Sequence, residues 1–363
     1  MRILHLHSEK NWGGGEKQLL QLVLGLKEHG VEQLLICPKG SMLERQCDQE
    51  KINKSPLRID SGISLITCYH FIKLINQYQP DLIHLHTSKA HTLAIVASVF
   101  SRMPPLVLTR RMNNRVSGNW FSRHKYNHPA IQKIICVSDR VKTTLSLAIP
   151  KEKLQSIYGG ISIADTEMKI DQNFLTDKYP HLNSKKVIGF VGRLTEVKDP
   201  LLFMEMVKTL HKSMDDLSFV IIGNGPLVDV LENEIRKYEL EGAVTLVGFT
   251  SDSISAISSL DLLVLTSRNE GIPNVILEAF VCQVPVLAVN VGGIPELIKD
   301  EKSGLLVNRS PQDLAVGAER LLQDADLRER VINGGKKRAQ QLDANKGIEA
   351  TLELYNRIIG ANS

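Results

Sequence analysis

The chain has 363 residues, which is too long for one ordinary hydrophobic core and predicts two domains. Its composition, 43% hydrophobic and 23% charged with few aromatic residues, is that of a soluble globular protein. The net charge of +4 hides an asymmetry, because residues 1–160 carry 22 Lys and Arg against 11 Asp and Glu, and the remainder carries 22 against 29. A basic amino-terminal half favours an anionic partner, and the alternative is a solvated surface with uneven charge.

The sequence shows no membrane, secretion or disulfide signal. It has no run of about 18 apolar residues, and it opens on a strand pattern, Met1 to His7, without a secretory apolar region. The five cysteines are odd in number and scattered without a Cys-x-x-Cys pair, which argues against a disulfide or zinc framework. We therefore expect a cytoplasmic protein that associates at most peripherally with the inner face of the cell membrane.

Short apolar runs alternate with longer amphipathic runs along the whole chain. The predicted strands are 2–7, 33–38, 82–86, 106–109, 133–138, 187–192, 218–223, 244–249, 262–267, 284–289 and 304–307. The predicted helices include 16–29, 89–100, 200–212, 227–238, 274–282, 311–322 and 344–359. Strands that read as continuous Val, Ile and Leu and alternate with helices predict parallel sheets covered on both faces.

The alternation is interrupted at about 162–186, a polar stretch without a strong period. We therefore predict an amino-terminal domain over 1–165 and a carboxyl-terminal domain over 185–343, both doubly wound α/β domains with a cleft between them. We expect the final segment, 344–363, to form a helix that packs back on the first domain.

The most informative stretch is 269–278, Asn-Glu-Gly-Ile-Pro-Asn-Val-Ile-Leu-Glu, which follows a predicted strand and opens a helix. Ligands of open α/β sheets bind at this edge. The helix start offers N–H groups to an anion, Pro273 suits the first helical position, and Glu270 and Glu278 can accept hydrogen bonds from hydroxyls. The helix is otherwise apolar, so Glu278 is better interpreted as a buried acid that needs a partner than as an exposed one. The combination suits a nucleotide sugar, which is half diphosphate and half polyol.

Two further loops each follow the first predicted strand of a domain. Gly13 to Gly15 allow positive φ and a close approach of backbone to a ligand, with a tight structural turn as the alternative. Their spacing does not fit the dinucleotide-binding fingerprint. In the second domain, Arg193 and Lys198 can bracket a diphosphate, with a surface pair to Glu196 as the alternative.

Alternation along the strand 82–86 places His84 and His86 on the same side, with His86 at the carboxyl end. There, His86 could hydrogen-bond a sugar or the reacting centre, whereas His84 is better interpreted as a polar core residue. We find no metal-ligand spacing and no Asp-x-Asp motif that would clamp a metal on a nucleotide diphosphate. We therefore predict no metal and no bound cofactor.

Three arginines, Arg110, Arg111 and Arg115, precede a stretch of mixed aromatic and basic residues, 120–125. Such a pattern suits a phosphorylated or lipid-linked partner at a membrane surface. Nucleic acid is a weaker alternative because no binding-module signature is present, and a solvated loop is another.

The order and spacing of these motifs resemble the GT-B-fold glycosyltransferases of the large retaining family 4, also called glycosyl transferases group 1, over nearly the whole chain. The most specific part is the pair Glu270 and Glu278 with seven residues between them. The supporting segments are 192–194 with Lys198, 222–226, 247–249, 291–296, 13–15, His86, 137–138 and 159–161. The resemblance implies two Rossmann-like domains that face each other across a cleft.

The resemblance also implies a role for each matching position. Arg193 and Lys198 would grip the donor diphosphate, Glu278 would hold the ribose, and Glu270 would hold the transferred sugar, with His86 near it. The remaining residues expected around the donor are Gly14, Gly15, Gly192, Gly223, Val247, Phe249, Gly271, Ile272, Pro273, Asn274 and Val275.

The implied activity moves a hexosyl-type sugar from a nucleotide-diphosphate sugar, UDP-linked by preference, to a saccharide or an anionic lipid-linked acceptor. Anomeric configuration would be retained. No metal would be needed, because cations and helix amides stabilise the departing diphosphate. Cell-surface polysaccharide or lipopolysaccharide synthesis is the expected setting. The alternatives are a nucleotide-sugar epimerase of the same fold, a phosphorylase, which normally has a much longer chain, and a non-catalytic two-domain sugar-binding protein.

Overall fold

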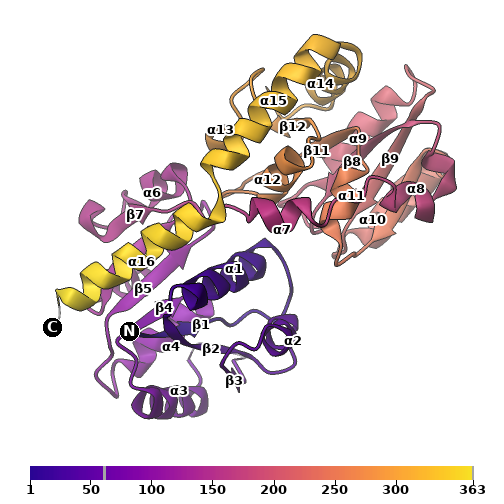
Figure 1. Cartoon of the computed structure of the whole chain (residues 1–363). Coiled ribbons are helices and arrows are strands. Elements are labelled where there is room, and N and C mark those ends of the chain that lie inside the picture. Colours follow the sequence, from indigo (N-terminus) through magenta and orange to yellow (C-terminus); the bar gives the residue numbers. More distant parts are fainter. Residues whose placement is uncertain (60–62, 362–363) are drawn as a thin grey trace. The chain divides into compact units, whose positions relative to one another are not determined.

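The computed structural model describes residues 1–59 and 63–361 and divides the chain into two compact units (Figure 1). Unit 1 comprises residues 1–160 and 344–363, and unit 2 comprises residues 161–343. Each unit contains one parallel β-sheet with helices on its faces. The predicted α/β class with two Rossmann-like domains is therefore confirmed.

Within the described residues, the sheet of unit 1 has seven parallel strands in the order β3-β2-β1-β4-β5-β6-β7. The strands are β1 (Arg2–Leu6), β2 (Glu32–Pro38), β3 (Lys54–Leu57), β4 (Leu82–Leu85), β5 (Leu106–Arg110), β6 (Ile131–Cys136) and β7 (Leu154–Ser156). The helices are α1 (Gly14–Glu28), α2 (Met42–Gln49), α3 (Leu65–Tyr78), α4 (Ser88–Ala97), α5 (Trp120–Asn127), α6 (Asp139–Leu145) and α16 (Ala344–Gly360), with a 3-10 turn at Lys151–Lys153.

Unit 2 has six parallel strands in the order β10-β9-β8-β11-β12-β13. The strands are β8 (Lys186–Val191), β9 (Leu217–Ile222), β10 (Val244–Gly248), β11 (Leu262–Leu265), β12 (Val286–Val289) and β13 (Leu305–Val307). The helices are α7 (Ile163–Glu167), α8 (Phe174–Lys178), α9 (Pro200–Leu210), α10 (Val228–Lys237), α11 (Ser253–Ser258), α12 (Asn274–Val281), α13 (Ile294–Leu297), α14 (Pro311–Gln323) and α15 (Ala325–Gln341), with a 3-10 turn at Pro180–Leu182.

In both sheets the first strand of the unit lies in the interior of the sheet. The next two strands along the chain are added on one side of it, and the later strands are added on the other side. In unit 1 the change of side lies between β1 and β4, and in unit 2 it lies between β8 and β11. The crevice at the carboxyl ends of two such strands is where open α/β sheets bind ligands. The loops after β1, β4, β8 and β11 are therefore the places to look for a site in each unit.

The polar stretch before β8 is part of unit 2, because its polar groups hydrogen-bond to α11. Ser255 Oγ donates to the Lys169 carbonyl at 2.8 Å, and the Asp171 N–H donates to Ser258 Oγ at 3.2 Å. The stretch has no strong hydrophobic period because it contacts the domain mainly through such bonds, with Leu175 as a buried apolar anchor. Composition alone did not reveal these short helices.

Helix α16 lies beside α1 in unit 1 and contributes to the core on one face of the sheet (Figure 1). Ile348 and Tyr355 from α16 pack with Ile3 and Leu82 from the strands. A Cβ added to Gly25 of α1 would lie 2.3 Å from Ile348 Cδ1, so the glycine allows the two helices to approach closely.

Candidate functional site

In unit 2, the loops after the neighbouring strands β8 and β11 bring Lys198 and Glu270 together. The Lys198 ammonium group forms an ion pair with Glu270 Oε1, which also accepts a hydrogen bond from Ser267 Oγ at 2.7 Å. Lys198 thus pairs with Glu270 and not with Glu196, the alternative partner that the sequence offered. Arg193 is exposed, and among the described residues no ion pair is recorded for it. The predicted diphosphate-binding cations and the predicted sugar-binding acid thus occupy one edge of one sheet.

The backbone of Glu270 is held by the turn that precedes α13. Gly292 has a φ of +56°, and a Cβ at this position would lie 2.2 Å from the Glu270 carbonyl oxygen. The Gly293 N–H donates to the same oxygen at 3.1 Å. Only glycine fits at position 292, which explains why the Val-Gly-Gly-Ile-Pro-Glu segment accompanies the glutamate pair.

Helix α12 places Glu278 in the interior of unit 2, where its residue exposure is only 8%. The helix begins at Asn274, and Pro273 is its N-cap with extended φ and ψ, so the prediction of Pro273 as the first helical residue was wrong by one position. Gly271 is buried, whereas Ile272, Asn274 and Val275 are partly exposed. The N–H groups in the first turn of a helix have no partner within the helix, which favours an anion at this end of α12.

The other predicted donor-side residues follow the adjacent strands β8, β9 and β10. The Gly192 N–H donates to Ile222 O, and the Gly223 N–H donates to Gly248 O, both at 2.9 Å. Gly223 has a φ of +143°, and a Cβ there would lie 1.8 Å from the Gly192 carbonyl oxygen. Beyond Gly248, Phe249 is 56% exposed at the end of an edge strand, and Val247 is partly exposed. An exposed aromatic ring at this position is available to stack on a base.

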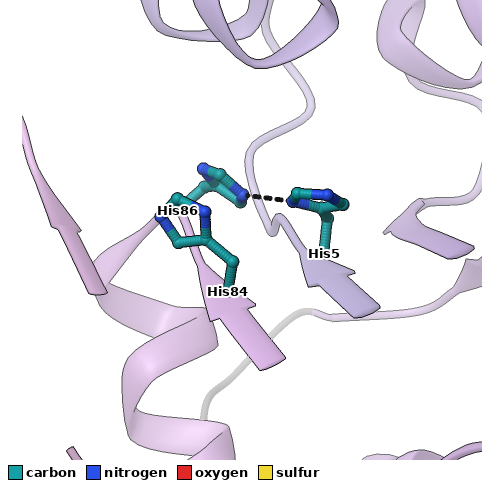
Figure 2. A group of neighbouring side chains, drawn as sticks. All are labelled: His5, His84 and His86. Carbon is teal, nitrogen blue, oxygen red and sulfur yellow. Dashed lines mark hydrogen bonds between the residues drawn. The ribbon is translucent and has the colours of Figure 1, made fainter. Parts of the chain in front are cut away.

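In unit 1, His84 and His86 of the β4 segment lie beside His5 of β1 (Figure 2). The rings of His84 and His86 are 3.9 Å apart between centroids, which confirms that both lie on one side of the strand. His84 Nδ1 lies 2.5 Å from the Tyr355 hydroxyl, and Nε2 lies 2.6 Å from the Thr109 hydroxyl. His84 is therefore a hydrogen-bonded core residue, as expected.

A chain of hydrogen bonds assigns the tautomers of His5 and His86. The chain begins at the Val23 carbonyl, which can only accept. Gln33 Nε2 donates to the Val23 carbonyl at 2.9 Å, which leaves Gln33 Oε1 to accept from His5 Nε2 at 3.0 Å. His5 Nδ1 must then accept from His86 Nε2, also at 3.0 Å. His86 Nδ1 is left as a buried acceptor with no partner among the described residues.

Each of the three histidines offers one nitrogen, and these nitrogens lie within 4.8 Å of one another. This is the group of described residues that could hold a metal ion, and sequence spacing missed it because His5 is on a different strand. Zinc prefers such neutral imidazoles. However, every nitrogen except His86 Nδ1 already has a hydrogen-bonding partner, so the group is stable without an ion.

The glycine loop of unit 1 begins α1, with Gly13 as its N-cap and Gly14 and Gly15 as its first residues. None of the three has a positive φ, so the conformational reason predicted for these glycines was wrong. A Cβ at Gly15 would lie 3.4 Å from Arg111 Cδ, which is an ordinary van der Waals contact, so the packing of unit 1 does not itself require a glycine at this position.

The three predicted acceptor-side arginines do not form one patch. Arg111 turns inward, where its Nη1 donates to the His86 carbonyl at 2.8 Å and burial lowers the pKa of its guanidinium to about 10. Arg115 is exposed, and Arg110 Nη2 donates to the Asn114 carbonyl at 3.1 Å. Arg110 therefore ends β5 and binds the loop before α5, Arg115 lies exposed in that loop, and Arg111 turns toward His86.

Comparisons with known proteins agree with this geometry. Residues 171–338 match the family described as glycosyl transferases group 1, and residues 12–165 match glycosyltransferase family 4. The capsular polysaccharide biosynthesis glycosyltransferase CapM of Staphylococcus aureus is 24% identical over 92% of each chain. The GalNAc-α-(1→4)-GalNAc-α-(1→3)-diNAcBac-PP-undecaprenol α-1,4-N-acetyl-D-galactosaminyltransferase of Campylobacter jejuni is 23% identical over 99% of this chain and 100% of its own.

The fold also matches a solved structure. HepE of Anabaena, in complex with UDP and glucose, superimposes with a TM-score of 0.85 at 22% identity, over 98% of this chain and 100% of that one. The two family matches together account for most of both units. The chain therefore belongs to the GT-B glycosyltransferases, in the family of glycosyl transferases group 1.

Proposed function

We propose that this glycosyltransferase moves a hexosyl-type sugar from a UDP-linked donor to a saccharide or lipid-linked acceptor, with retention of anomeric configuration and without a metal. The observation that carries the proposal is the Lys198–Glu270 ion pair beside exposed Arg193 and the start of α12. An incoming diphosphate would compete for Lys198 and release the Glu270 carboxylate to accept hydrogen bonds from sugar hydroxyls. The relatives named above for capsular polysaccharide and undecaprenol-linked glycan synthesis support this class of acceptor.

The charges suit a metal-free departure of the diphosphate. Arg193 offers a planar fork and Lys198 a point charge, and both act where negative charge grows during transfer. Glu278, buried on α12, is suited to the ribose hydroxyls. In unit 1 we assign donor contacts to Gly14 and Gly15, and we assign to His86 a place near the transferred sugar.

The central test is the double variant Arg193→Ala with Lys198→Ala. Because hydrogen bonds to charged groups contribute about 1.5–3 kcal/mol each, UDP affinity should fall at least ~100-fold and transfer should be lost. Arg236→Ala with Lys237→Ala removes two exposed cations of the same unit from α10 and is the matched control. Wild-type UDP affinity and transfer in the site variant would exclude the diphosphate assignment.

Donor identity can be read from a panel of nucleotide sugars scored by thermal shift. A donor at about 100 times its dissociation constant should stabilise the protein by roughly 2.7 kcal/mol. Product NMR then reports the anomeric configuration, and assays with a chelator report metal dependence. Conversion of the donor without an acceptor would indicate an epimerase, and binding without any turnover would indicate a sugar-binding protein.

We also propose that the acceptor side of unit 1 meets an anionic membrane surface at its inner, cytoplasmic face. Trp120 is 76% exposed, Phe121 and Met112 are each 45% exposed, and Arg115 lies in the same segment. Among the described residues, no helix combines the length and apolar character needed to cross a bilayer. Exposed aromatic rings next to cations suit the headgroup region instead.

Liposome co-sedimentation tests this contact. Binding should require anionic lipid and should weaken in Arg110→Ala with Arg115→Ala and in Trp120→Ala. Arg102→Ala, at another site of the same unit, is the control. Binding that is indifferent both to lipid charge and to these substitutions would contradict the proposal.

A further inference from the structure

Unit 2 holds one buried carboxylate to which the proposed chemistry gives no role. Asp199 follows Lys198 and is 3% exposed. Its Oδ2 accepts a hydrogen bond from Arg268 Nε at 3.1 Å and forms a second ion pair with the Arg309 guanidinium. Although Asp199 precedes α9, its side chain makes no capping bond to that helix. The carboxylate therefore binds the two arginines and does not cap the helix.

The backbone of Asp199 is also unusual. Its φ of +53° and ψ of +56° lie in the left-handed region, where residues other than glycine are uncommon. Asp and Asn enter this region more often than other residues with a side chain, so Asp199 suits the sharp turn before α9. Two arginines from different loops pair with its carboxylate, so the turn and the ion pairs occur at the same residue.

Several bonds tie the Asp199 segment to the loop that carries Glu270. The Thr266 hydroxyl, fully buried, lies 2.8 Å from the Asp199 carbonyl oxygen and 3.1 Å from that of Lys198. The Arg268 N–H donates to the Val197 carbonyl at 2.8 Å. The Arg268 side chain then reaches Asp199, so one short segment of the second loop contacts three consecutive residues of the first.

We propose that Asp199 is a positioning residue that fixes Lys198 against Glu270 and so presents both to the donor diphosphate. The inference rests on the proposed function of Lys198. Loss of the Asp199 charge would release Arg268 and Arg309 and loosen the loops after β8 and β11. The Lys198 ammonium could then move away from the second phosphate of a bound nucleoside diphosphate. The ribose contact would be unaffected, because Glu278 is held separately by α12.

The test compares the two phosphates of the nucleotide. Asp199→Asn keeps the shape of the side chain and tolerates the left-handed backbone. Calorimetry gives the dissociation constants of UMP and UDP. The UMP constant divided by the UDP constant measures how much the second phosphate contributes to binding. We expect this ratio to fall about tenfold in Asp199→Asn and in Lys198→Ala, with no further fall when the two are combined. A role confined to stability would weaken UMP and UDP equally and leave the ratio at its wild-type value.

Arg268→Ala provides a second variant, because Arg268 is 56% exposed and its loss leaves Asp199 paired with Arg309. It should lower the same ratio by a smaller factor, even if Asp199→Asn folds poorly. If Lys198→Ala lowers the ratio and neither Asp199→Asn nor Arg268→Ala does, the positioning role is wrong and the diphosphate assignment stands. If Lys198→Ala leaves the ratio unchanged, the diphosphate assignment is wrong and the positioning role falls with it.

Discussion

The two units differ in the basic and acidic side chains that they bury. In the part of unit 1 that the structure describes, five histidines and one lysine are buried, namely His5, His7, His84, His86, His91 and Lys125. Unit 2, described throughout, buries two carboxylates, Asp199 and Glu278, and both of its histidines, His181 and His211, are exposed. Unit 1 therefore buries mainly imidazoles, whereas unit 2 builds its site from paired charges.

The difference corresponds to two kinds of recognition. Burial lowers the pKa of His5 to about 4 and that of His91 to about 3, so both imidazoles are neutral at pH 7 and serve as hydrogen-bonding groups. Neutral donors and acceptors suit hydroxyl groups. In unit 2, Lys198 and Arg193 are cations that suit a diphosphate, and Glu270 pairs with Lys198. The two units should therefore respond differently to substitution and to pH.

The largest expected effect comes from Gly223→Ala, which should destabilise unit 2 alone. The new Cβ would lie 1.8 Å from the Gly192 carbonyl oxygen at a φ of +143°, so the strand ends of β8 and β9 must separate. We expect a loss of at least about 3 kcal/mol in the stability of unit 2. Both tryptophans, Trp12 and Trp120, are in unit 1, so calorimetry should show an earlier transition that tryptophan fluorescence does not follow.

The control for this substitution is Gly242→Ala, because a Cβ there meets nothing within 4 Å and its φ is not positive. It should change the melting temperature little. Equal losses in Gly242→Ala and Gly223→Ala would mean that the close approach at the strand ends is not the cause.

Acid should act on unit 1 first. A histidine with an unfolded pKa of 6.5 and a folded pKa of about 4 binds its proton more readily in the unfolded state between these values. The stability due to the neutral form is complete above pH 6.5 and is lost as the pH falls toward 4, by about 3 kcal/mol for a residue such as His5. Tryptophan fluorescence should therefore report unfolding of unit 1 in this window while part of the far-ultraviolet circular dichroism persists. A fluorescence change that occurs only with the last loss of dichroism would refute this order.

Tyr355→Phe should have a moderate effect that is confined to unit 1. The substitution removes the hydroxyl beside His84 Nδ1 and leaves a buried ring nitrogen without a partner, at a cost of about 1–3 kcal/mol. The melting transition followed by fluorescence should move to lower temperature. Tyr69→Phe, at a residue that is 66% exposed, is the matched control and should leave this transition in place.

The sequence predicts the strands that read as apolar runs, and it misses those that depend on partners; two long helices, α3 and α15, were not among its predicted elements either. Two strands were not predicted, β3, which contains Pro56, and the three-residue β7, because both are short and lie at the edges of the sheet. Their propensity is low, and pairing with a neighbour decides their conformation.

The same limit applies to the sites. Periodicity predicted that His84 and His86 share a face, but it could not bring His5 to them, because β1 pairs with β4 across nearly 80 residues of chain. The available signal was a matching alternation of His5 and His7 in the first strand. Likewise, Lys198 and Glu270 were both predicted as functional residues, whereas their ion pair follows only from β8 and β11 being neighbours.

The smallest expected effect separates the buried charges of unit 2 from its surface charges. The Arg320–Glu301 pair has a short contact of 2.7 Å, but both side chains are 47% exposed. Solvent screens such a pair, and ordering two long side chains costs entropy, so Arg320→Gln should change stability by no more than about 0.5 kcal/mol. Denaturant unfolding at low and high salt measures this value. A loss well above 1 kcal/mol would mean that an exposed ion pair stabilises unit 2 as much as a buried one. The distinction between the buried ion pairs of Asp199 and the surface pairs would then be wrong.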